Sequence, residues 1–134
     1  MKNIPFLLSG IIVGLILFQS GLVAPAINKL IRAEDASIFL RFIWPKFFLI
    51  IGSISFVSFL IITFCNSNQN LFKYLFLAGS LLMLVCYVIT PMINEAKDSS
   101  NEQLWSILHM LTILLTLLVL GINALIVFLW ATKN

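Results

Sequence analysis

The chain has 134 residues, of which 61% are hydrophobic and only 10% are charged, and its formal net charge is +3. A soluble domain of this size needs more polar side chains to cover its surface, so the composition excludes that class and indicates a protein in contact with the lipid bilayer. The small positive charge suits anionic lipid head groups. Because the sequence contains no run of basic residues, we expect no nucleic-acid partner.

Four charge-free stretches are long enough to cross a bilayer as helices, since a hydrocarbon core of about 30 Å needs about 20 helical residues. We place the membrane cores of these spans at residues 6–24, 47–65, 74–93 and 106–130. Transmembrane strands alternate polar and apolar residues over about 10 positions and would not give apolar runs this long. The sequence therefore predicts an all-α fold, an integral membrane four-helix bundle that forms one domain over residues 1–134.

The first span carries small residues at helical spacing, Gly10, Gly14 and Gly21. Small residues on one helix face let two helices approach closely, and such packing drives helix association in lipid. We interpret this face as a packing surface within the chain. The alternative is a contact with a second copy of the chain or with a membrane protein partner. In the second span, Gly52, Ser55 and Ser58 suit a similar close contact.

A Pro-centred hexapeptide occurs twice, at residues 23–28 and 89–94, each time at the end of a long apolar run. The repeat indicates that the bundle is built from two pseudo-repeated helical hairpins. Proline lacks an amide hydrogen and disfavours helix at the residue before it, so we expect Pro25 and Pro91 to lie at helix ends. Pro45, at the start of the second span, is the third predicted helix-end proline.

The charges lie mainly in two connections, between spans one and two and between spans three and four. These connections carry all five acidic residues and five of the eight Lys and Arg residues. The other three, Lys2, Lys73 and Lys133, lie toward the opposite membrane face. The positive-inside rule therefore favours cytoplasmic charged loops. The short polar segment 66–70 predicts that spans two and three are adjacent and antiparallel.

Polar side chains inside the spans gather near the charged loops. In span four, His109, Thr112, Thr116 and Asn123 recur at intervals of three, four and seven, which places them on one face that we expect to point inward. The charged-loop half of the bundle is thus predicted to contain a polar pocket. Its candidate residues are Gln19, Asn28, Arg41, Lys46, Tyr87, Thr90, Asn94, His109 and Thr112. The alternative is that these groups only satisfy one another.

His109 is the candidate metal ligand, although the sequence requires no cofactor. The chain has one histidine, so a bis-histidine haem would need a second subunit, and copper would need methionine or cysteine partners that form no tight cluster here. Cys65 and Cys86 are too far apart along their spans for a disulfide. No intramembrane carboxylate accompanies His109 and no nucleophile motif occurs, so we expect no catalysis.

Four short segments carry a family resemblance. They read GLVAPA at residues 21–26, RFIWPKFF at 41–48, TPMIN at 90–94 and LHMLT at 108–112. With these segments the chain resembles the transmembrane-protein-205-like family, also called domain of unknown function 4149. The resemblance implies a four-helix membrane protein with prolines at helix ends and a histidine in the fourth helix, and it implies no established reaction. The family is also distantly similar to copper-resistance membrane domains, which keeps metal handling among the hypotheses.

Two functions from different classes follow. The first is a small non-enzymatic accessory or scaffold subunit whose glycine face meets a partner or a second copy. The second is a ligand-handling membrane protein that binds a metal, a haem or a small amphiphile in the polar pocket. The second predicts that His109→Ala removes binding while the fold survives.

Overall fold

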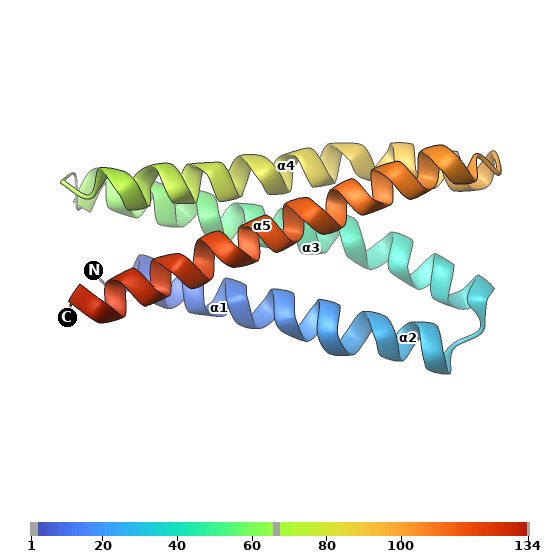
Figure 1. The fold of residues 1–134 in the computed structure, drawn as a ribbon, viewed down its shortest axis with the longest axis horizontal. Coiled ribbons are helices and arrows are strands. Elements are labelled where there is room, and N and C mark those ends of the chain that lie inside the picture. The colour runs from blue at the N-terminus through green and yellow to red at the C-terminus, as the bar shows by residue number, and fades with distance from the viewer. Residues whose placement is uncertain (1–2, 66–67, 134) are drawn as a thin grey trace.

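The computed structural model describes residues 3–65 and 68–133, with the side chain of Lys133 left out, and these residues form helices and short turns only. The elements are α1 (Ile4–Phe18), a π-helix η1 (Gln19–Val23), α2 (Ala24–Leu30), α3 (Ala33–Cys65), α4 (Asn70–Asp98) and α5 (Glu102–Lys133). The start of α1, the end of α3, the start of α4 and the end of α5 lie at one end of the bundle (Figure 1). The connections 31–32 and 99–101 lie at the other end, here named the charged-loop end.

The all-α four-helix bundle predicted from the sequence is confirmed. Four helical segments are long and apolar enough to cross a membrane: Ile4–Leu30, Ala33–Cys65, Asn70–Asp98 and Glu102–Thr132. The predicted membrane cores lie inside them, but the helices are longer. At 1.5 Å per residue, the 33 residues of α3 span about 50 Å, so part of this helix extends beyond a hydrocarbon core of about 30 Å.

The charged connections are therefore much shorter than the sequence indicates. Between α2 and α3, only Ile31 and Arg32 are outside helices, because α3 begins at Ala33. Its first turn contains Glu34 and Asp35, and Arg32 pairs with Asp35 at 3.2 Å. Acidic residues at a helix N-terminus stabilise it through the helix dipole. The predicted turn at 66–70 falls partly on residues 66–67, and Lys2 is also among the residues outside the described part of the chain.

The prediction that the three prolines end their helices is wrong. Pro45 and Pro91 lie inside α3 and α4, and Pro25 lies in the first turn of α2, which continues the first span. Membrane helices tolerate proline where neighbouring helices and local π adjustments satisfy the freed backbone groups. At Pro25 the adjustment is visible, because the proline ring would crowd the carbonyl of Gly21, and Gly21 lies within η1. The second half of the chain has no π-helix in its described residues, so the repeat is not symmetrical.

The closest helix contact joins α3 and α4. A Cβ atom added at Gly52 would lie 3.2 Å from Met83 Cβ and 3.7 Å from the Ser80 carbonyl, and one added at Gly79 would lie 3.5 Å from Ser55 Oγ. The predicted close contact at Gly52 and Ser55 is thus confirmed. These small residues bring the two backbones together, which is how helices associate in lipid.

The glycine face of the first span does not pack within the chain, which corrects the prediction. Gly10, Gly14 and Gly21 are exposed, and an added Cβ atom at each would meet nothing within 4 Å. The reason is that α1 turns a different face inward, which carries Phe6 and Ile12 among its buried residues. The glycine face is therefore open to lipid or to another protein.

The inward polar face predicted for the fourth span is confirmed for Thr112, Thr116 and Asn123, which are all buried. Asn123 makes a link between helices, because Ser9 Oγ of α1 donates to Asn123 Oδ1 at 2.8 Å. The Asn123 amide in turn donates to the Val119 carbonyl at 2.9 Å. One buried hydrogen bond thus ties α5 to α1 at the end of the bundle away from the charged loops.

We expect Asn123→Ala to lower the free energy of unfolding by about 1 kcal/mol, since hydrogen bonds between membrane helices contribute about 0.6 kcal/mol on average and at most about 1.7 kcal/mol. Denaturation in detergent, followed by circular dichroism, measures the loss. Ser9→Ala should add little in the Asn123→Ala background, because its acceptor is already gone. Full additivity of the two losses would contradict the link.

The helices separate at the charged-loop end. The α1 helix contacts α3 and α5. Among the described residues, α2 contacts the adjoining η1 and α3, and it has no Cα atom within 8 Å of one in α4 or α5. In Figure 1, α2 diverges from the ends of α4 and α5. Side chains from all four spans line the space between these helices.

Candidate ligand-binding pocket

A pocket with a volume of about 610 Å³ lies at the charged-loop end. On the first span, Ser20 of η1 and Ala24 and Asn28 of α2 are spaced four residues apart, so they form one face of the wall. The α5 wall extends from Trp105 to Leu117, a rise of about 18 Å. The pocket is therefore elongated along the bundle axis.

The polar part of the wall is nearest the charged loops. Arg41 of α3 and Lys97 of α4 line it, together with the amide side chains of Asn28 and Asn94. The described lining contains no Asp or Glu side chain. The wall at this end is thus positive and rich in hydrogen-bond donors.

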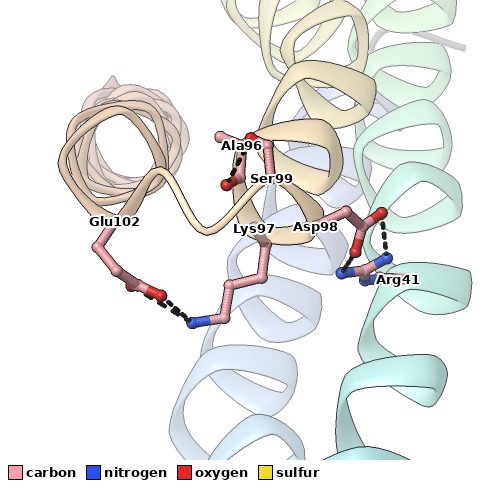
Figure 2. Close-up of polar contacts among 6 residues, drawn as sticks. All are labelled: Arg41, Ala96, Lys97, Asp98, Ser99 and Glu102. Carbon is pink, nitrogen blue, oxygen red and sulfur yellow. Dashed lines mark hydrogen bonds and ion pairs between the residues drawn. The ribbon is translucent and has the colours of Figure 1, made fainter.

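Two ion pairs hold the cations in place (Figure 2). Arg41 donates two hydrogen bonds to Asp98, at 3.1 and 2.6 Å, and the Lys97 ammonium donates to Glu102 at 3.1 Å. Lys97 and Asp98 are neighbours in sequence but point to opposite sides, so the end of α4 is tied to both α3 and α5 (Figure 2). The two acidic side chains are 64% and 65% exposed, which puts the negative charges on the water side of the pairs.

Aromatic side chains form the next layer of the wall. Trp105 and His109 stack on α5 with their ring centroids 5.1 Å apart and their planes 8° from parallel. The Lys97 ammonium lies 4.5 Å from the centroid of Trp105, within the range of a cation–π contact. Across the pocket, Trp44 stacks on Phe48 at 5.7 Å. Flat aromatic rings therefore flank the part of the pocket that lies next to the cations, on the side away from the charged loops.

The deepest part of the wall is largely apolar. Phe48, Ile113 and Leu117 line it beside the hydroxyl groups of Ser20 and Thr116, and Ile113 and Leu117 are partly exposed. The hydroxyls of Thr90 and Thr112 donate to carbonyls of their own helices, at 2.9 and 2.8 Å. The polarity of the pocket therefore falls with distance from the charged loops.

The structure brings six of the nine predicted pocket residues to this wall: Asn28, Arg41, Thr90, Asn94, His109 and Thr112. The other three lie outside it. Gln19 is buried at the start of η1, and its Nε2 has no hydrogen-bond partner. Lys46 lies over the Phe42 ring at 3.2 Å and donates to the Phe42 carbonyl. Tyr87 is 41% exposed on the outer face of α4.

Sequence reasoning missed Trp44, Trp105, Lys97 and Ser37 as pocket residues. Lys97 was assigned to the connection between spans three and four, which is helical at this residue in the structure. Their spacing carried a usable signal, since Trp44 follows Arg41 by three residues and His109 follows Trp105 by four. Each pair therefore shares a helix face.

The donor set around His109 does not form a metal site within one chain. Among residues 3–65 and 68–133, no group of three or more His, Cys, Asp or Glu side chains could hold a metal ion. Cys86 is buried and Cys65 is exposed, and both are free thiols.

The long apolar helices define the class, an integral membrane helical bundle, which here has a pocket at one end. Residues 7–102 match the family described as Domain of unknown function (DUF4149), and the chain belongs to this family. The match covers Pro25, Pro45 and Pro91 but ends before His109. No curated protein and no solved structure matches the chain.

Proposed function

We propose that the protein binds a small amphiphile in the pocket at the charged-loop end. One observation carries this proposal, the pocket of about 610 Å³ whose wall changes from cationic and polar to apolar along its length. Ligand pockets in proteins have volumes of about 300–1,000 Å³ and combine apolar walls with a few directed polar groups. A molecule with a polar head and an apolar tail matches this gradient.

The separation of α2 from α5 supports access from the membrane. Without backbone contact between these helices, a ligand can enter sideways from the lipid, and Ile113 and Leu117 continue the apolar wall onto the outer surface. An amphiphile entering this way keeps its tail in hydrocarbon and its head at the charged-loop level. This route avoids moving the polar head across the bilayer, which would be costly.

We propose binding without catalysis. The described lining contains no carboxylate to act with His109 as an acid–base pair, and no thiol reaches the wall. The aromatic and cationic side chains of the wall bind the amphiphile, orient it and provide positive charge for its head. A metal or a haem remains the competing ligand, in which case His109 is its anchor.

His109→Ala is the variant that tests the proposal. We expect it to lower the amount of amphiphile that stays bound severalfold, because the Trp105 stack and the polar ring edge are lost from the pocket. Native mass spectrometry of protein purified in mild detergent measures the bound mass. Met110→Ala is the matched control, because Met110 is the next residue on α5, is 53% exposed and does not line the pocket.

Three results decide between the ligands. A retained amphiphile that is reduced in His109→Ala, with an unchanged unfolding temperature, supports the proposal. Stoichiometric metal or a haem absorption band that disappears in the variant supports the metal or haem hypothesis instead. Bare protein under all detergent conditions contradicts both.

A second candidate function rests on the open glycine face. We propose, as the alternative, an accessory or scaffold subunit that meets a second copy or a membrane protein partner through Gly10, Gly14 and Gly21. Their exposure, with nothing within 4 Å of an added Cβ atom, supports a contact outside the chain. Cross-linking in the membrane tests it, and an unchanged pattern after Gly14→Leu would contradict it.

Two finer assignments accompany these proposals. We propose that the charged-loop end faces the cytoplasm, because it carries five of the eight Lys and Arg residues. The pocket would then draw its ligand from the cytoplasmic leaflet. We also keep the transmembrane-protein-205-like relationship as a proposal within the wider family.

A further inference from the structure

The charge of the pocket wall is unbalanced. Arg41 and Lys97 line the pocket, while their partners Asp98 and Glu102 do not and are largely exposed. In each ion pair, the acidic side chain thus lies on the side of the cation that faces water. A ligand inside the pocket meets the cationic groups without meeting a carboxylate.

The cations also retain donors for a ligand. A guanidinium has five N–H groups, and the bond pair to Asp98 uses two of them. The Lys97 ammonium has three N–H groups, and its oxygen contacts are both to Glu102. Asn28 and Asn94 add amide groups to the same wall, and no hydrogen bond joins either side chain to another described residue. The polar end of the pocket therefore has a surplus of donors.

From these observations we propose that the ligand is an amphiphile with an anionic head, a phosphate or a carboxylate, bound by Arg41 and Lys97. This inference rests on the proposed function and names its ligand class. Arginine pairs with both oxyanions in a bidentate geometry, and lysine binds them as a point charge. Asp98 pairs with the same guanidinium but does not line the pocket, so it competes with the ligand for Arg41.

The long apolar part of the pocket favours an anion that carries an apolar tail over a free anion such as phosphate. The wall extends about 18 Å along α5, from Trp105 beside the cations to Leu117 in the apolar part. A free phosphate would occupy only the polar end and would leave the apolar wall without a contact. The head therefore lies among Arg41, Lys97 and Asn94, with the tail along Phe48 and Leu117.

The test compares ligands that differ in one group. Phosphatidic acid and diacylglycerol with identical acyl chains differ only in the phosphate, and oleate and oleyl alcohol differ only in the head. Glycerol 3-phosphate supplies the phosphate without a tail. Titration calorimetry in a non-ionic detergent gives the Kd of the full chain for each. We expect at least one anionic member to bind tenfold tighter or more than its neutral partner, since a hydrogen bond to a charged group contributes about 1.5–3 kcal/mol.

Three variants separate head-group binding from a structural role of the ion pair. Arg41→Gln should weaken binding of the anionic lipid by about tenfold. Asp98→Asn breaks the same pair but leaves the cation, so binding should be kept or tightened. Arg32→Gln is the matched control, because Arg32 also pairs with an aspartate near this end but does not line the pocket. If the pair served structure alone, Arg41→Gln and Asp98→Asn would weaken binding equally.

Failure of this inference differs from failure of the proposed function. Equal binding of the charged and neutral partners, unaffected by Arg41→Gln, would overturn the anionic head and leave amphiphile binding in place. Binding of glycerol 3-phosphate as tight as that of phosphatidic acid would overturn the lipid source. Absence of binding for every probe would overturn both the ligand class and the proposed function.

Discussion

Ala24→Trp is expected to remove most amphiphile binding while the bundle stays folded. Ala24 lines the pocket from α2, and the helix there has no neighbour in α4 or α5 that a larger side chain would displace. An indole at this position occupies space that the ligand needs. Overfilling a packed site costs about 1–3 kcal/mol, which corresponds to a rise of roughly 5- to 150-fold in Kd. Calorimetric titration with phosphatidic acid measures the change.

Leu22→Trp is the control for this effect. Leu22 is two residues earlier in the same span, is 59% exposed and does not line the pocket. It introduces the same side chain at nearly the same membrane depth, so its Kd should match that of the unchanged chain. Equal loss of binding in both variants, or no loss in Ala24→Trp, would show that the ligand lies elsewhere.

Gly52→Leu is expected to cause the largest loss of stability. A Cβ atom alone would come within 3.2 Å of Met83 Cβ, and the remaining leucine atoms would push α3 and α4 apart. Overpacking of this kind costs about 1–3 kcal/mol or more. The effect matters in lipid because these two helices are held mainly by close packing. Detergent denaturation followed by circular dichroism measures the free energy of unfolding.

Gly14→Leu is the matched comparison for Gly52→Leu. The same substitution is made in a membrane helix, but nothing lies within 4 Å of an added Cβ atom at Gly14. We expect the free energy of unfolding to change by no more than about 0.5 kcal/mol. A loss as large as that of Gly52→Leu in the isolated protomer would mean that the glycine face packs within the chain after all.

The helices and the inward face of the fourth span could be predicted from the sequence because both depend on local periodicity. Charge-free stretches of this length have one stable solution in hydrocarbon, since a helix satisfies its own backbone. The spacing of Thr112, Thr116 and Asn123 fixed their common face, and all three are buried. The same periodicity grouped Arg41, Asn94 and His109 at one end, and all three line the pocket.

Features that depend on tertiary context could not be predicted. A proline signals a helix end in isolation, but neighbouring helices let α3 and α4 pass through Pro45 and Pro91. Glycine spacing indicates a contact face, but it does not determine whether the contacting helix belongs to the same chain. In this structure Gly14 faces outward. Gln19 is buried at the start of the π-helix at residues 19–23 and does not line the pocket, and the sequence contains no local pattern that predicts a π turn.

Photo-cross-linking of the bound lipid tests amphiphile binding at the charged-loop end most directly. The probe is phosphatidic acid with a diazirine in its acyl chain, and the labelled peptides are identified by mass spectrometry of the full chain. We expect labelling to concentrate at the apolar part of the pocket, around Ala24, Ile113 and Leu117, and to fall when unlabelled phosphatidic acid is added. Labelling spread over the lipid-facing side chains of all helices, with no competition by the unlabelled lipid, would contradict a specific pocket.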